Sequence, residues 1–178
     1  EVLASLGNMA FNNLGWSFPR VTEDYFVLRA EEMGHPLIPA DRRISNSFTL
    51  EGAGKAIIVT GSNMSGKSTF LRTCGVNAVL AFAGAPVCAS AFTVSLVRLH
   101  SSMRISDSLE ENISSFYAEL RRLRAIISGA ESDPKVFLLL DEILRQRVLE
   151  QIATGTGLDR LDHMTLVAED RDHHDVAG

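Results

Sequence analysis

The residues best suited to chemistry lie in a glycine-rich segment that runs from Gly61 to Thr69. Gly61 and Gly66 enclose four residues, and Lys67 and Ser68 follow at once. Glycines let the backbone turn its N–H groups toward an anion, a lysine in this place reaches the β- and γ-phosphates, and a serine hydroxyl ligates Mg²⁺. This spacing predicts a loop that cradles the phosphates of a nucleoside triphosphate.

The segments on either side must position this loop. A β-branched, apolar run covers residues 56–60, and a helical pattern runs from Ser68 to about Phe82. A strand before the loop and a helix after it are the context that separates a phosphate loop from a chance glycine-rich turn. The helix also points its positive N-terminal end at the bound anion.

A second candidate segment is the apolar run from Val136 to Leu140, which ends in Asp141 and Glu142. Such a run suits a central parallel strand that is covered on both faces. Asp141 would hold Mg²⁺ together with Ser68, and Glu142 would act as the general base that polarises the attacking water. Alone this motif is weak, but downstream of a phosphate loop it is a strong indication of an ATPase.

The remaining pattern predicts an α/β fold. Helical character runs from Val2 to about Leu14, and an amphipathic helix covers about 114–127. Further strands are expected over 25–30, 44–50 at an edge, and 92–99. We expect a mostly parallel sheet with strands 56–60 and 136–140 side by side or nearly so, flanked by helices, with a small antiparallel lobe from 25–50.

Composition limits the partners of the chain. Its 178 residues carry a net charge of −5, which argues against extensive contacts with a nucleic-acid backbone by this segment itself. The sequence has no secretory signal and no apolar run long enough to cross a membrane. Cys74 and Cys88 fit no metal motif, so we expect buried free thiols in a cytoplasmic protein. The opening without Met suggests a piece of a longer polypeptide.

Residues 60–72 resemble the ATP-binding loop of the MutS family of DNA mismatch-repair ATPases. Asn63-Met64 is the discriminating feature, while Ser62 stands where many members carry proline. Gly34-His35-Pro36 followed by Ile44-Ser45-Asn46 resembles the family segment that borders the adenine. Residues 104–120 resemble its Asp…Ser-Thr-Phe-x-x-Glu-Met region. The similarity covers roughly residues 1–144.

This resemblance implies a P-loop NTPase of ABC type that binds ATP or ADP with Mg²⁺ and works as a homodimer through the ATPase domain. Lys67 and Glu142 would be catalytic, and Ser68 and Asp141 would hold the metal. Ser114 matches the serine that touches the γ-phosphate held by the other subunit, although it could equally be a helix N-cap. Mismatched double-stranded DNA would be bound by domains absent from this chain. The expected nucleotide-binding residues are Gly61, Ser62, Asn63, Met64, Ser65, Gly66, Lys67, Ser68, Thr69 and Ile44.

The resemblance also divides the chain. Residues 1–20 would end an upstream helical domain, 21–144 would form the ATPase domain, and 145–178 would be a divergent or truncated tail. The family's Gly-Thr loop after the Asp-Glu pair is missing, and Glu169-Asp170 stands where its Thr-His pair would be. We therefore expect a frameshifted, deleted or divergent end, with nucleotide binding retained and turnover impaired.

Two other readings of the same loop stay open. A phosphate-loop kinase acting on a small molecule would need lid arginines, for which Arg121, Arg122 and Arg124 are candidates by composition. A non-catalytic module that binds nucleotide or dimerises would follow if the altered tail abolished turnover. The Asn-Met loop and Ser114 argue against the kinase.

Overall fold

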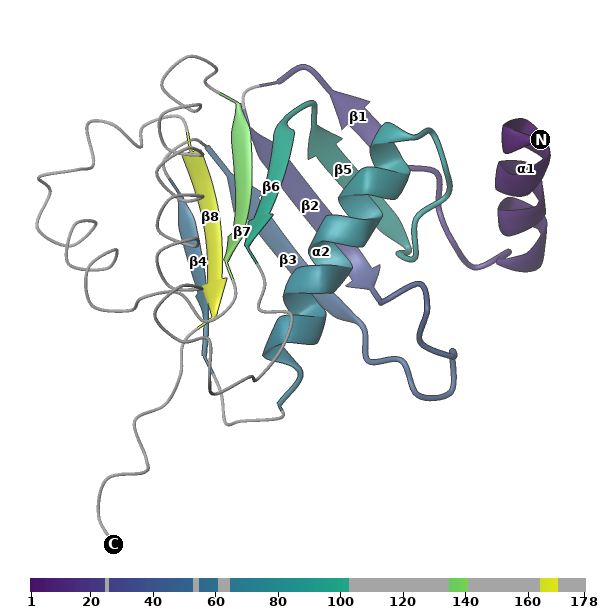
Figure 1. Ribbon diagram of the computed structural model, residues 1–178, viewed down its shortest axis with the longest axis horizontal. Coiled ribbons are helices and arrows are strands. Elements are labelled where there is room, and N and C mark those ends of the chain that lie inside the picture. The colour runs from purple at the N-terminus through teal and green to yellow at the C-terminus, as the bar shows by residue number, and fades with distance from the viewer. Residues whose placement is uncertain (25, 53–54, 61–64, 103–134, 141–163, 170–178) are drawn as a thin grey trace, which may run out of the picture. The chain divides into compact units, whose positions relative to one another are not determined.

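The computed structural model describes residues 1–24, 26–52, 55–60, 65–102, 135–140 and 164–169 (Figure 1). The chain divides into two compact units, each with a four-stranded sheet. The first unit joins Glu1–Gly52 to Thr69–Val97, and the second joins Ala53–Ser68 to Arg98–Gly178. The α/β class expected from the sequence is confirmed.

The first unit holds a mixed sheet in the strand order β1-β5-β2-β3. β1 runs parallel to β5, and β2 runs antiparallel to both β5 and β3. β3 therefore lies at an edge, as predicted. The bounds of these strands are β1 Arg20–Thr22, β2 Val27–Met33, β3 Asn46–Glu51 and β5 Ala91–Ser95.

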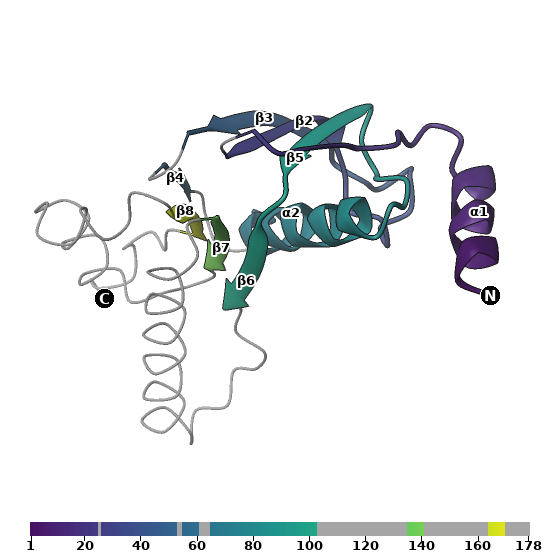
Figure 2. The ribbon, with the colours of Figure 1, turned by 90° about the horizontal axis from the view of Figure 1, so that it is seen from above.

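Helix α2, Lys67–Phe82, covers one face of this mixed sheet (Figure 2). On β2, buried Leu28 and Ala30 alternate with exposed Arg29 and Glu31, so one face of the strand is apolar. The helix contributes apolar side chains at a helical spacing, which closes the core of this unit. These buried helix residues are Leu71, Cys74, Ala78 and Ala81.

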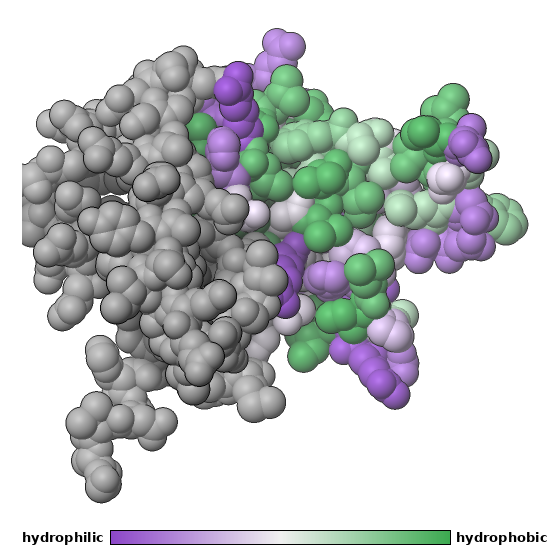
Figure 3. Space-filling model, in the orientation of Figure 1, coloured by the Kyte–Doolittle hydropathy of each residue, from purple (hydrophilic) through white to green (hydrophobic). Residues whose placement is uncertain are grey.

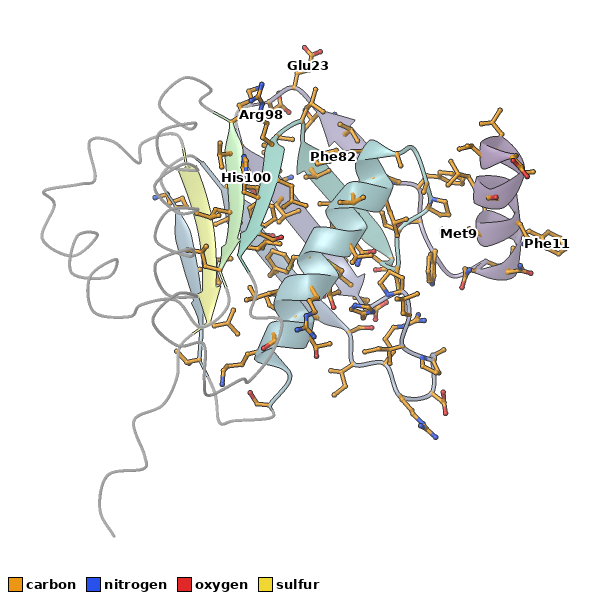
Figure 4. The ribbon with its side chains drawn as sticks, in the orientation of Figure 1. Met9, Phe11, Glu23, Phe82, Arg98 and His100 are labelled. Carbon is orange, nitrogen blue, oxygen red and sulfur yellow. The ribbon has the colours of Figure 1, made fainter. Side chains whose placement is uncertain are left out.

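Helix α1, Val2–Asn12, confirms the predicted N-terminal helix but buries none of its side chains. Val2, Leu3 and Phe11 are all exposed, and Phe11 points away from the mixed sheet (Figure 4). In Figure 3 the surface over α1, at the right, carries both hydrophobic (green) and hydrophilic (purple) residues. Helix α1 thus adds no buried side chain to the core of the first unit.

The second unit holds a wholly parallel sheet in the strand order β4-β8-β7-β6. β7 is buried along its whole length, as its continuous apolar sequence predicts for a strand covered on both faces. β8 lies between β4 and β7, which makes these two strands near neighbours, as expected. The bounds are β4 Ala56–Val59, β6 Arg98–Ser102, β7 Val136–Leu140 and β8 Met164–Glu169.

Two expectations about the sheets are wrong. In place of one mostly parallel sheet with a small antiparallel lobe, the described residues form two four-stranded sheets, one parallel and one mixed. The strand expected over 92–99 is two strands, β5 and β6, which belong to different sheets. Phe92, Val94 and Leu96 alternate along and just past β5, the pattern changes phase at Val97, and the exposed Leu96 lies at the break. The helix expected over 114–127 lies outside the described residues.

Candidate functional site

The parallel sheet brings to one edge the ends of the two strands that precede the candidate segments. Ile58 pairs with Ala168, and Ala168 pairs with Leu140, so these three residues form one row across β4, β8 and β7. Because the strands are parallel, their carboxyl ends meet at the same edge of the sheet. The glycine loop follows β4 there, and Asp141 and Glu142 follow β7. With one strand between them, β4 and β7 are about 10 Å apart.

The described end of the glycine loop has the backbone that its sequence predicts. Gly66 adopts a φ of +88°, a region that favours glycine, and a Cβ built there would meet no atom within 4 Å. Glycine is therefore required at this position by backbone conformation and not by lack of space. Gly61, Ser62, Asn63 and Met64 lie outside the described residues, as do Ser114, Asp141 and Glu142.

Helix α2 begins directly after this glycine, at Lys67. Its first turn contains no acidic side chain, so the partial positive charge of the helix N-terminus is not neutralised from within the helix. Lys67 is only 6% exposed, Ser68 and Thr69 are half-buried, and Ser65 is exposed. Gly66 in the left-handed conformation is thus followed directly by the buried Lys67, which is the first residue of α2. The N-terminus of a helix favours the binding of an anion.

The segment expected to border the base is a folded loop in the first unit. Ile44 is 82% exposed, which leaves its side chain available to a ligand. Arg43, beside it, turns back into the loop, where its Nε and Nη2 atoms donate to the carbonyl oxygen of Ile38 at 3.0 and 2.8 Å. Its guanidinium also lies 5.7 Å from the centre of the Trp16 ring. Arg43 thus stabilises the loop from within.

Strand β3 and the start of this loop both lie beside α2. The rings of Phe48 on β3 and Phe70 on α2 meet edge to face, with their centroids 5.3 Å apart. Burial lowers the pKa of His35, and the positive charges of Arg72 on α2 and Arg43 lower it further. The base-side loop, residues 34–45, therefore packs against α2 within the first unit.

Sequence reasoning missed Asn77, which connects this loop to the helix. Asn77 is fully buried in α2, and its amide donates to the carbonyl oxygens of Thr73 and Gly34 and accepts from the N–H of Cys88. The available signal was an amide residue beside the apolar positions of a buried helix face. Such a residue needs partners, because an unbonded polar group in a core is costly.

Other chemistry is limited in the part of the chain that the structure describes. Within it, no three His, Cys, Asp or Glu residues gather as a metal site would require. Cys74 and Cys88 are buried free thiols, as predicted. No described helix is both long and apolar enough to span a bilayer.

The fold and the candidate site together define an α/β protein in which a parallel strand leads through a glycine loop into a helix. Residues 57–157, more than half of the chain, match the family model described as MutS domain V. The chain belongs to the MutS family.

Three relatives show how far this similarity extends. The DNA mismatch repair protein MutS of Erythrobacter litoralis is 36% identical over 152 residues, which cover 82% of this chain and 17% of the relative. The protein of the same name from Chlorobium phaeobacteroides is 34% identical over 145 residues, with shares of 72% and 16%. The Endonuclease MutS2 of Thermus thermophilus is 29% identical over 174 residues, with shares of 90% and 23%. The chain thus spans less than a quarter of each relative.

Proposed function

We propose that this chain is the ATP-binding and ATP-hydrolysing segment of a MutS-type protein. The observation that carries this proposal is the common edge of the parallel sheet, where β4 leads toward Lys67 and β7 ends next to Asp141 and Glu142. Membership of the MutS family supports it. A phosphate-binding loop and an acidic strand end that meet at one sheet edge are the parts that phosphoryl transfer to water needs.

Each residue has a role set by its chemistry. Backbone N–H groups of residues 61–66 and the Lys67 ammonium would bind the β- and γ-phosphates. The Ser68 hydroxyl and the Asp141 carboxylate are oxygen ligands of the kind that Mg²⁺ prefers, and bound Mg²⁺ would offset the negative charge of the phosphates. Glu142 would accept a proton from the water that attacks the γ-phosphorus. Ile44 would contact the base.

The partners follow from the relatives and the charge of the chain. We propose that two copies associate through this segment and that Ser114 of one copy faces the γ-phosphate bound by the other. The names of two relatives support a role in mismatch repair. With a net charge of −5, this chain is a poor ligand for a DNA backbone, so contacts to mismatched DNA are assigned to other parts of a longer protein.

The altered tail is expected to lower the rate of ATP hydrolysis more than the affinity for ATP. β8 occupies the place between β4 and β7, but it ends in Glu169 where the sequence resemblance calls for a Thr-His pair. We propose that ATP binding is retained and that hydrolysis is slow. The alternative of a non-catalytic nucleotide-binding module corresponds to a chain in which hydrolysis is lost altogether.

Measuring ATP binding and phosphate release on the purified chain tests this function. Lys67→Ala should weaken binding at least about tenfold and abolish phosphate release, whereas Glu142→Gln should retain binding and lose phosphate release. Lys55→Ala is a matched control, since Lys55 is exposed and precedes β4. A chain that does not bind ATP would refute the proposal, and turnover that survives Glu142→Gln would remove Glu142 as the base. Binding without any hydrolysis would favour the non-catalytic module, and ATP-dependent phosphorylation of a metabolite would favour the kinase.

A further inference from the structure

Helix α1 has a row of exposed residues along one side. Leu3, Gly7 and Phe11 follow one another at intervals of four, so they are neighbours on the helix surface. The side chains of Leu3 and Phe11 are 84% and 77% exposed, and a Cβ built at Gly7 would meet no atom within 4 Å. Within the part of the chain that the structure describes, the row is therefore open along its whole length.

The half-buried residues of α1 lie on a different side. Leu6, Met9 and Asn13 recur at the spacing i, i+3 and i+7, which places them roughly a third of a turn from the open row. The Asn13 amide donates to the carbonyl oxygen of Met9 at 2.9 Å and so closes the end of the helix. Phe11, by contrast, points away from the mixed sheet (Figure 4). The described residues thus leave the open row uncovered.

The segment that carries this row has no charged side chain. The residues from Val2 to Pro19 include no Asp, Glu, Lys or Arg, although 22% of the whole chain is charged. Two copies of a chain with a net charge of −5 repel each other, and the repulsion is weakest where the facing surfaces are neutral. The row on α1 is therefore a surface through which two copies of the chain can approach.

The exposed apolar area is large enough to support an interface. Val2, Leu14 and Phe18 are also exposed, and they flank the row in sequence. An aromatic side chain presents roughly 150–250 Å², so two phenylalanines with three aliphatic neighbours offer several hundred Å². Each partner in an interface of standard size buries about 800 Å². The apolar side chains of the segment would thus supply most of one side of a dimer interface.

The order of residues in the row suits a second copy of itself. Leu3 and Phe11 lie four positions before and four positions after Gly7, so an antiparallel copy presents the same row in reverse. Each Leu3 would then meet the partner's Phe11, and the two glycines would meet where the helices cross. A glycine without a side chain lets two backbones approach closely there. Such a self-complementary contact closes about a two-fold axis.

We propose that α1 is a homodimerisation surface, in which the row of Leu3, Gly7 and Phe11 pairs antiparallel with the same row of a second copy. Unlike the association through Ser114, this pairing needs no nucleotide, so it does not depend on the proposed function. It predicts that the chain forms dimers in the absence of ATP and Mg²⁺, with a dissociation constant in the micromolar range.

Sedimentation equilibrium of the full chain without nucleotide tests this pairing. At about 100 µM, wild type should show twice the 19.4 kDa mass of one chain. Leu3→Glu and Phe11→Lys should each weaken dimerisation at least about tenfold, because each sets a charge against an apolar side chain twice in every dimer. Val79→Glu, a matched change at an exposed apolar residue of α2, should leave the mass unchanged.

Mixing the two charged variants tests the antiparallel direction. One Leu3→Glu chain and one Phe11→Lys chain would set the new carboxylate against the new ammonium at one contact and keep the native leucine–phenylalanine contact at the other. The equimolar mixture should therefore dimerise at least about tenfold more tightly than either variant alone. A parallel pair would gain neither contact, because identical positions would face each other.

Gly7→Leu separates the pairing from the stability of the helix itself. Leucine favours a helix more than glycine does, so α1 should be at least as helical in this variant. The larger side chain at the crossing should nevertheless weaken the dimer at least about fivefold. Circular dichroism and sedimentation equilibrium measure the two effects separately.

Three results would overturn the inference. A wild-type chain that stays monomeric at about 100 µM would leave the row to a different partner. A dimer that neither Leu3→Glu nor Phe11→Lys weakens would form through another surface. A mixture of these two variants that associates no better than its components would exclude the antiparallel row. None of these results bears on ATP binding by Lys67, so this inference and the proposed function fail independently.

Discussion

Val59 and Glu169 are direct partners in the parallel sheet, each as the last residue of its strand. The strand that leads into the glycine loop therefore ends beside a strand that closes with an acidic residue. On the proposed function, the negative charge of a residue at this strand end would repel a triphosphate that is not neutralised by a cation.

Removing this charge should strengthen the binding of metal-free triphosphate. Glu169→Gln is expected to raise the affinity for ATP in EDTA about twofold at low salt, with a smaller effect as salt is added, because salt screens the interaction between two charges. Titration calorimetry at two ionic strengths measures this. Glu31→Gln, an exposed change in the mixed sheet, is the control. A weaker affinity after Glu169→Gln would contradict the expected repulsion.

Gly66 and Gly84 make a matched pair for testing the glycine loop. Both have a positive φ, at +88° and +74°, and a Cβ would have open space at either position. Alanine at each should lower the free energy of unfolding by about 1–2 kcal/mol through backbone strain alone. Only Gly66→Ala should also weaken ATP binding, because Gly84 lies beyond the other end of α2. Urea unfolding and ATP titration of both variants would check this. Equal ATP affinities for the two variants would contradict a role of the glycine loop in ATP binding.

His35 should make stability depend on pH. Its pKa is lowered from the usual value of 6.5 by burial and by Arg72 and Arg43, so the folded state favours the neutral imidazole. The stabilisation is fully present above pH 6.5 and is lost as the pH falls toward the lowered pKa of the folded state. The urea midpoint of wild type should therefore fall more between pH 7.5 and 5.5 than that of His35→Gln. Identical pH profiles for the two proteins would contradict the assigned shift.

The two cysteines should resist alkylation in the native protein. Burial raises the pKa of Cys74 strongly and that of Cys88 as well, and the thiolate is the reactive form. Iodoacetamide at pH 8, followed by mass spectrometry, should label neither thiol quickly until urea is added. Rapid native labelling of Cys74 would show that the core around α2 opens readily.

The sequence predicted the features that depend on neighbouring residues and missed those that depend on residues far away in the chain. The strand, the glycine loop and helix α2 are adjacent in sequence, and the described part of this order is confirmed. The division of 92–99 between two sheets depends on pairing partners far away in the chain, Leu28 for Val94 and Val136 for Arg98, and no local pattern carries that information.

Asn77 shows the same limit at the level of one residue. Its partners Gly34 and Cys88 lie 43 and 11 positions away, so the sequence indicates a buried amide but not what it bonds. β8 is the opposite case. Its apolar run 164–168 lies within a strand that pairs with β4 and β7, despite the divergence of the surrounding sequence.

The central claim is that Lys67 and its loop bind the phosphates of ATP, and calorimetric titration of ATP with Mg²⁺ tests it most directly. Wild type and Lys55→Ala should bind with the same affinity, and Lys67→Ala should bind at least about tenfold more weakly, because it loses a charged contact to phosphate. Equal affinities for all three proteins, or no binding by wild type, would contradict the claim.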